Sequence, residues 1–164
     1  MENKFNEAIY AGSFDPITKG HIDIIQKSSK VFDRIHVVIM INSQKKYAFS
    51  LEERLEMIRN ATKEFGDKVV VDSYCGLLVN YCEEKGIYTV VRGLRAMTDF
   101  DYEFQMALTN RSLDERVESV MFVADSNYTY ISSSVVKEIA SYGGDISFMV
   151  DPYVEKKLKE LYAK

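Results

Sequence analysis

The 164-residue sequence predicts a doubly wound α/β fold, in which helices cover both faces of a five-stranded parallel sheet. Three observations support this prediction. Short β-branched runs alternate along the chain with segments whose apolar residues recur at helical spacing. The run from Arg34 to Ile41 is almost continuously apolar, as in strands buried on both faces. No linker or repeat interrupts the alternation, so we expect residues 1–164 to form a single domain.

The first third of the chain predicts a strand, a loop, a helix and a second strand. Ala8 to Ala11 form the first strand, and the helix runs from His21 to Phe32. Arg34 to Ile41 is the second strand. After a polar stretch, Ser50 and Glu53 form a capping box, in which a hydroxyl and a carboxylate satisfy the free backbone donors of the next helix.

The remaining elements continue this alternation. Strands are expected at 68–73, 89–92 and 117–124, and helices at about 77–85, 99–113 and 132–142, with a last helix starting at Asp151-Pro152. Gly86 and Gly143-Gly144 follow two of the helices, at positions that commonly end a helix. The resulting fold is Rossmann-like, and ligands of such folds bind beyond the carboxyl ends of the strands.

Composition and charge exclude several classes of protein. The 21 basic and 25 acidic residues leave a net charge of −4, which argues against a general nucleic-acid binder. The longest strongly apolar run, Val37 to Ile41, is far too short to span a bilayer, so we expect a cytoplasmic protein without a membrane partner. Cys75 and Cys82 have no zinc-binding spacing to either histidine, and we expect reduced core thiols.

The loop after the first strand, Gly12 to His21, is the most specific feature of the sequence. It brings small residues and a histidine to the start of a helix, where free backbone N–H groups suit a phosphate. The loop lacks the pattern of a Walker loop and the three spaced glycines of a dinucleotide-binding loop. An alternative interpretation of His21 is a histidine that only caps the helix.

Basic residues follow two other predicted strands. Arg92 and Arg95 lie close together, and each guanidinium is a rigid fork of donors that matches phosphate oxygens. A solvent-exposed ion pair is the alternative for these arginines. Lys45 and Lys46 follow the second strand and could reach the same crevice. Periodicity predicts that Leu77 and Leu78 are core residues.

Two segments resemble the nucleotidylyltransferase superfamily. Thr18-Lys19-Gly20-His21 is similar to its [HT]-x-G-H hallmark, and Ile131 to Lys137 is similar to its serine-rich helix start. In that superfamily the serine-rich segment holds the β- and γ-phosphates of ATP.

A third segment, Arg92 to Glu103, resembles the bacterial phosphopantetheine adenylyltransferases in particular. Ser43 to Lys46 and Leu51 to Arg54 extend this likeness over nearly the whole chain. Ser13 stands where many members have threonine, which keeps a hydroxyl. Tyr128-Thr129-Tyr130 stands where some members have tryptophan, so the resemblance does not define the adenine contacts in detail.

The resemblance implies a set of site residues. His21 is implied as the stabiliser of the transition state, and no metal ligand is implied in the protein. The implied ATP-binding residues are Ser13, Phe14, His21, Gly93, Leu94, Arg95, Glu103, Tyr128, Thr129, Tyr130, Ile131, Ser132, Ser133 and Ser134. The implied substrate-binding residues are Ser13, Lys45, Leu78 and Arg92.

The implied reaction transfers AMP from ATP to 4′-phosphopantetheine and forms dephospho-coenzyme A and pyrophosphate, the penultimate step of coenzyme A biosynthesis. Mg²⁺ is expected to travel with ATP, because no compact carboxylate cage is visible in the sequence. The resemblance also implies a homohexamer and inhibition by coenzyme A. Two alternatives are a sibling transferase that uses nicotinamide mononucleotide or glycerol phosphate, and a nucleotide-binding module without turnover.

Overall fold

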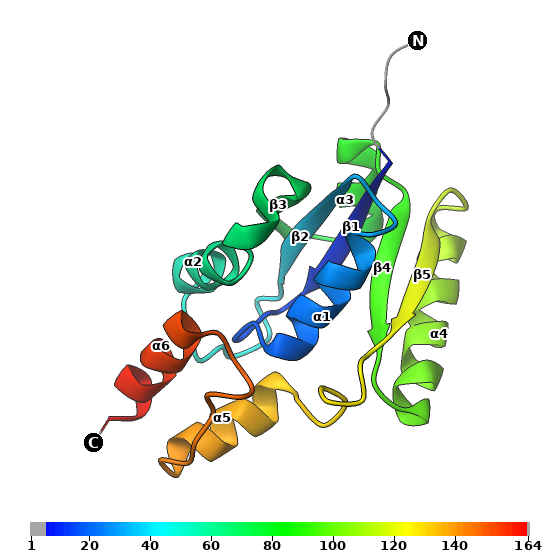
Figure 1. The fold of residues 1–164 in the computed structure, drawn as a ribbon. Coiled ribbons are helices and arrows are strands. Elements are labelled where there is room, and N and C mark those ends of the chain that lie inside the picture. Colours follow the sequence, from blue (N-terminus) through cyan, green and yellow to red (C-terminus); the bar gives the residue numbers. More distant parts are fainter. Residues whose placement is uncertain (1–5, 164) are drawn as a thin grey trace.

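The computed structural model describes residues 6–163, apart from the side chain of residue 98. It contains a five-stranded, wholly parallel sheet in the order β3-β2-β1-β4-β5, which confirms the predicted fold class (Figure 1). The strands are β1 (Glu7–Gly12), β2 (Arg34–Ile41), β3 (Val69–Cys75), β4 (Thr89–Leu94) and β5 (Glu118–Val123). The helices are α1 (Lys19–Ser28), α2 (Leu51–Ala61), the 3-10 segment η1 (Lys63–Lys68), α3 (Leu78–Lys85), α4 (Met97–Leu113), α5 (Ser133–Ser141) and α6 (Pro152–Tyr162).

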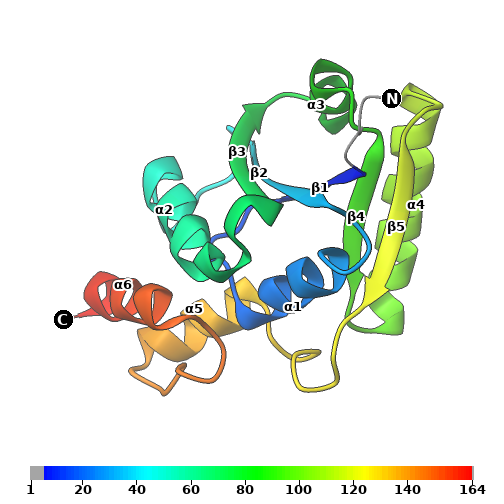
Figure 2. The same ribbon diagram turned by 45° about the horizontal axis from the view of Figure 1, so that its top comes forward.

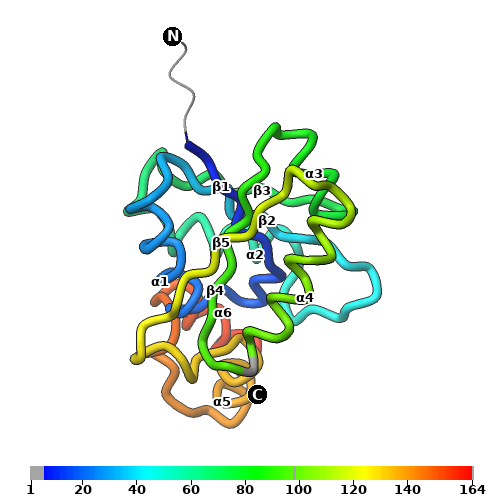
Figure 3. The backbone as a smooth tube through the Cα atoms, turned by 90° about the vertical axis from the view of Figure 1, so that its right-hand side faces the viewer, coloured from blue at the N-terminus to red at the C-terminus, as the bar shows by residue number. Residues whose placement is uncertain are grey.

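Helices cover both faces of the sheet. Figure 2 shows α3 and α4 on one side and α1, α2, α5 and α6 on the other. Adjacent residues of β1 point to opposite layers: Tyr10 packs in the core under α1 and α2, whereas Ile9 packs with Val79 and Cys82 of α3. At the end toward which the strands run, α5 and α6 lie side by side (Figure 3).

Local signals explain the helix ends. Ser50 accepts a hydrogen bond from the backbone N–H of Glu53, whose carboxylate accepts one from the backbone N–H of Ser50, so the predicted capping box is present. Gly86 adopts a left-handed conformation at the end of α3, with φ of 69°, as predicted. Asp151 caps α6 and precedes a proline in its first turn.

Two predictions about burial are wrong in part. Cys82 is fully buried, but Cys75 is exposed because it is the last residue of β3. Leu78 is partly buried, whereas Leu77, the residue before the first turn of α3, is 55% exposed. Both errors concern residues at the ends of elements, where periodicity no longer determines which side is buried.

A close approach between β4 and α1 positions the site. A Cβ atom added to Gly93 of β4 would lie 2.9 Å from Cγ1 of Ile24, so only glycine allows this spacing. The strand also continues two residues beyond its predicted end, to Leu94. As a result, the start of α1, with His21, lies beside the carboxyl end of β4. Within residues 6–163, no helix is long and apolar enough to cross a membrane.

Candidate active site

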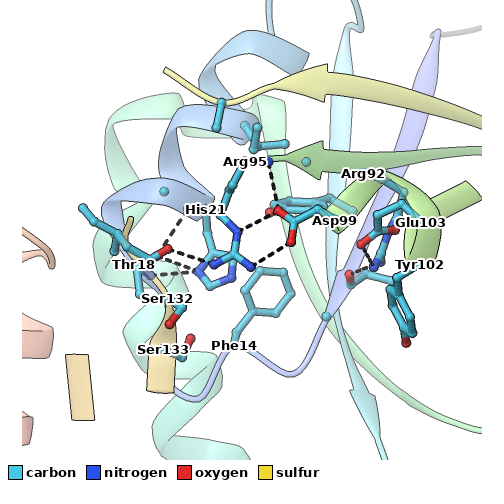
Figure 4. Close-up of a pocket in the computed structure, with 18 residues that line it drawn as sticks. Phe14, Thr18, His21, Arg92, Arg95, Asp99, Tyr102, Glu103, Ser132 and Ser133 are labelled. Carbon is cyan, nitrogen blue, oxygen red and sulfur yellow. Dashed lines mark hydrogen bonds and ion pairs between the residues drawn. The ribbon is translucent and has the colours of Figure 1, made fainter. Parts of the chain in front are cut away.

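A cavity of about 370 Å³ lies where β1 and β4 end, at the point where the strand order reverses direction (Figure 4). Ligands of doubly wound folds bind at this position. The cavity is lined by Tyr10, Ala11, Gly12, Phe14, Thr18, Gly20, His21, Ile24, Arg92, Gly93, Arg95, Asp99, Tyr102, Glu103, Ala124, Ile131, Ser132 and Ser133.

The loop from β1 to α1 bends sharply at Phe14, whose φ of +45° is unusual for a residue other than glycine. The buried Phe14 ring packs edge-on against Tyr10 and His21, with ring centroids 5.4 and 5.0 Å away. Arg54 of α2 is almost completely buried and donates to the carbonyl oxygen of Ser13 at 2.8 Å. These contacts hold the loop in one conformation.

His21 takes part in a capping box at the start of α1. The backbone N–H of Thr18 donates to Nδ1 of His21 at 3.0 Å, and the Thr18 hydroxyl accepts from the backbone N–H of His21. Since Nδ1 accepts a hydrogen bond from the backbone N–H, the neutral ring carries its own proton on Nε2. The capping interpretation of His21 is therefore confirmed, and the same side chain also lines the cavity.

Burial, together with the positive charges of Arg95 and Arg92, lowers the pKa of His21 to about 4. At neutral pH the imidazole is therefore uncharged and offers a single N–H donor. An anion bound between the three groups would offset the effect of the arginines and raise this pKa.

Arg92 on β4 is held by a carboxylate of α4. Its guanidinium donates to the two carboxylate oxygens of Glu103 at 2.5 and 2.8 Å, and to the Ala11 carbonyl at 3.0 Å (Figure 4). Burial alone would lower the pKa of Arg92, but the hydrogen bond and charge of Glu103 raise it above its usual value. The Arg92–Glu103 ion pair is mostly buried, so it forms part of the cavity wall and is not a solvated surface pair.

Arg95 connects two segments that line the cavity. It donates to both carboxylate oxygens of Asp99, at 3.1 and 3.3 Å, and to the Ile131 carbonyl at 3.2 Å. Burial tends to raise the pKa of Asp99, but the hydrogen bonds from Arg95 lower it. The Arg95 side chain is 40% exposed, which leaves it accessible to a ligand. Both arginines are thus paired, and both pairs face the cavity.

The start of α5 forms another part of the cavity wall, next to Arg95. Ser132 caps the helix by accepting from the backbone N–H of Val135, and the Ser133 hydroxyl donates to the Pro16 carbonyl at 2.8 Å. Two helix N-termini, those of α1 and α5, therefore meet at one cavity. Their free N–H groups and dipoles favour an anion.

The structure brings most of the predicted site residues together. Phe14, His21, Arg92, Gly93, Arg95, Glu103, Ile131, Ser132 and Ser133 line the cavity. Ser13, Lys45, Leu78, Leu94, Tyr128, Thr129, Tyr130 and Ser134 are not among its lining residues. Of these, Lys45 is exposed on the loop after β2, and Tyr130 is 57% exposed in the segment before α5.

Sequence reasoning missed several lining residues, among them Tyr10, Asp99 and Tyr102. Asp99 had a visible signal, because it is an acidic residue at the start of a predicted helix, four residues after Arg95. Tyr10 had none, since its strand is apolar on both faces.

A cavity with two helix N-termini, at the reversal point of a parallel sheet, is characteristic of α/β proteins that bind nucleotides. The family model described as "Cytidylyltransferase-like" matches residues 9–139. A curated relative from Petrotoga mobilis, named "Phosphopantetheine adenylyltransferase", is 50% identical over 158 residues, which cover 96% of this chain and 97% of that protein. The chain therefore belongs to the phosphopantetheine adenylyltransferase family and is a nucleotidyltransferase.

Solved structures show the same fold. The nicotinic acid mononucleotide adenylyltransferase of Plasmodium falciparum, complexed with NaAD, superposes with a TM-score of 0.71 at 19% identity, covering 98% of this chain and 97% of that one. A lipopolysaccharide core biosynthesis protein from Thermoplasma volcanium gives a TM-score of 0.56 at 20% identity, covering 75% and 100%. At such low identity, these likenesses extend to the fold alone.

Proposed function

We propose that this chain transfers AMP from ATP to 4′-phosphopantetheine, forming dephospho-coenzyme A and pyrophosphate. One observation carries the proposal: a neutral histidine, two arginines and two helix N-termini converge on one cavity at the reversal point of the sheet. That arrangement offers hydrogen-bond donors and helix dipoles to phosphates, as AMP transfer between two polyanions requires.

The acceptor phosphate is itself the nucleophile. One of its oxygens bonds to the α-phosphorus of ATP while the bond to the bridging oxygen of pyrophosphate breaks, and pyrophosphate leaves with that electron pair. The protein then needs no nucleophile of its own. It has to hold the two substrates in line and to stabilise charge on the α-phosphate, for which Nε2–H of His21 is the proposed donor.

The two arginines divide the substrates in this proposal. Arg95 contacts the Ile131 carbonyl and lies close to the start of α5, which supports a role in binding ATP with Ser132 and Ser133. Arg92 lies deeper beside β1 and is assigned to 4′-phosphopantetheine, together with Lys45 and Leu78. Lys45 has to reach inward from its loop, since its side chain is outside the cavity lining.

Mg²⁺ would enter with ATP in this proposal. The two carboxylates that line the cavity, Asp99 and Glu103, are each bound by a guanidinium. Among the described residues, no three histidine, cysteine or acidic side chains gather into a metal site. This donor set favours a metal ion held by the phosphates of the nucleotide.

We also propose that the chain forms a homohexamer and that coenzyme A, which shares the product's phosphopantetheine arm, competes for the cavity. Phe100, Phe104 and Leu108 support self-association, because they form an exposed apolar ridge along α4. A cytoplasmic location is proposed as well, and the free state of both cysteines supports it.

The decisive experiment is release of pyrophosphate from ATP and Mg²⁺ with each of several acceptors. Release that depends on 4′-phosphopantetheine is the expected result. Release only with nicotinamide mononucleotide or glycerol phosphate would establish a sibling transferase. ATP binding without release with any acceptor would establish a binding module.

A further inference from the structure

The loop from β1 to α1 carries a buried carboxylate that does not line the cavity. Asp15 is 6% exposed and accepts three hydrogen bonds. Its donors are the backbone N–H groups of Ala48 at 2.9 Å and Phe49 at 3.1 Å, and Nζ of Lys137 at 3.0 Å. One side chain therefore joins the loop to two segments that are distant in the sequence.

The first of these segments lies on the acceptor side of the proposed site. Ala48 and Phe49 end the loop that follows β2 and holds Lys45. The Tyr47 hydroxyl accepts from the backbone N–H of Asn42 at 3.2 Å, which draws the two ends of the loop together. A shift of Ala48 would therefore move the whole loop and, with it, Lys45.

The second segment lies on the nucleotide side. Lys137 belongs to α5, one turn after the serines that open the helix. Ser133 is bonded to the carbonyl of Pro16, the residue after Asp15. The start of α5 is thus tied at two adjacent positions to the loop that Asp15 fixes on the acceptor side.

The three hydrogen bonds to the Asp15 carboxylate hold the joined segments firmly in place. The carboxylate is nearly shielded from water, and all three donors approach it within 3.1 Å. Charge-assisted hydrogen bonds of this kind are stronger than neutral ones, and loss of one partner leaves a buried charge unpaired.

We propose that Asp15 is a positioning residue, which sets the spacing between the Lys45 loop and the serine-rich start of α5 so that acceptor and nucleotide lie in line. The inference rests on the proposed function. Asp15 contacts neither substrate and transfers no proton. Its effect on the rate arises because a misplacement of about 1 Å between reacting groups lowers a rate roughly a hundredfold.

Four variants test the proposal: Asp15→Asn, Lys137→Met, Lys137→Arg and, as a control, Asp72→Asn. Asp72 also accepts from a backbone N–H and a lysine, but it lies on β3, away from the cavity. We expect kcat to fall about tenfold to a hundredfold in Asp15→Asn and Lys137→Met. We also expect ATP affinity measured alone to change by less than about threefold.

Lys137→Arg should restore most of kcat, because the ion pair to Asp15 survives, and Asp72→Asn should leave kcat unchanged. If Lys137→Met instead loses chiefly ATP affinity, Lys137 is a phosphate ligand and the proposal is wrong. Unchanged kcat in Asp15→Asn, or lower stability as its only defect, would also overturn it.

A second measurement needs no turnover. Hydrogen exchange at the amides of Ala48 and Phe49 should be faster in Lys137→Met than in the wild type, although Lys137 lies on the other side of the site. Equal exchange in the two proteins would overturn the inference. A wild type that releases no pyrophosphate with 4′-phosphopantetheine would instead contradict the proposed function, so the two failures are distinguishable.

Discussion

The backbone N–H of Thr18 donates to Nδ1 of His21 over 3.0 Å, and this bond determines which ring nitrogen carries the proton. With Nδ1 occupied, Nε2–H is the only donor that the neutral ring can offer to a ligand. A backbone group at the start of α1 thus orients the side chain and also selects its tautomer.

His21→Ala should affect turnover more than binding. Loss of one donor aimed at developing charge lowers kcat about a hundredfold to a thousandfold, or about 2.7 to 4 kcal/mol, while ATP affinity stays measurable. The variant should also be less stable by roughly 0.5 to 2 kcal/mol, because the His21 side chain no longer accepts the hydrogen bond from the backbone N–H of Thr18. The measurements are kcat, the ATP dissociation constant and the melting temperature of one preparation.

His21→Gln is the matched control for the cap, since glutamine at this helix position can bond to the N-cap backbone as in a capping box. It should recover most of the stability but not kcat. A destabilised His21→Ala enzyme with full activity per folded molecule would show that His21 is a cap and nothing more.

The lowered pKa of His21 predicts how stability depends on pH. The pKa is about 4 in the folded protein, whereas the ordinary histidine value of 6.5 applies to the unfolded chain, which therefore binds the extra proton between these values. Stability from this group is present above pH 6.5 and lost as the pH falls toward 4. At about pH 5 the loss is up to about 2 kcal/mol.

His21→Gln removes this titration, so its free energy of unfolding should decline less than that of the wild type between about pH 7 and about pH 5. Urea denaturation of both proteins at several pH values measures the difference. Parallel curves for the two proteins would show that His21 titrates normally in the folded state.

The division of substrates between the two arginines is testable by calorimetry. Arg92→Ala should weaken 4′-phosphopantetheine and Arg95→Ala should weaken ATP, each by about 1.5 to 3 kcal/mol or one to two decades in affinity. Arg92→Ala also frees the charge of Glu103. In the double variant Arg92→Ala/Glu103→Gln this charge is absent. Comparing the two variants therefore separates the loss of attraction between Arg92 and the phosphate from the repulsion by an unpaired Glu103.

Arg111→Ala is a suitable control, because this exposed arginine of α4 pairs only with Glu118 among the described residues and lies outside the cavity. It should bind both ligands normally. Equal losses of both ligands in Arg92→Ala and Arg95→Ala would mean that the arginines shape the cavity jointly and do not divide the substrates.

The strands β1 and β2 were predictable because their apolar runs are largely buried. The helices α2, α3 and α6 were predictable because Ser50, Gly86 and Asp151 each mark one end. The position of the site was predictable too, since the carboxyl ends of parallel strands meet at one edge. The ion pairs of Arg92 and Arg95 were not, because they depend on how α4 lies against β4. The position of Lys45 was not predictable either. Its exposed side chain lies outside the cavity, although Ala48 of the same loop is bonded to Asp15.

The apolar ridge on α4 leads to the last prediction. Phe100 and Phe104 stack with ring centroids 5.6 Å apart, and Leu108 continues the ridge one turn further on; the three side chains are 40, 49 and 54% exposed. Burial of such a ridge against other copies would remove apolar surface from water, so Phe104→Glu should shift the protein from the proposed hexamer to smaller species. Val31→Glu replaces an equally exposed apolar residue outside α4 and should keep the wild-type mass. Light scattering coupled to size-exclusion chromatography measures both variants. A Phe104→Glu protein with unchanged mass would exclude this face of α4 from the interface.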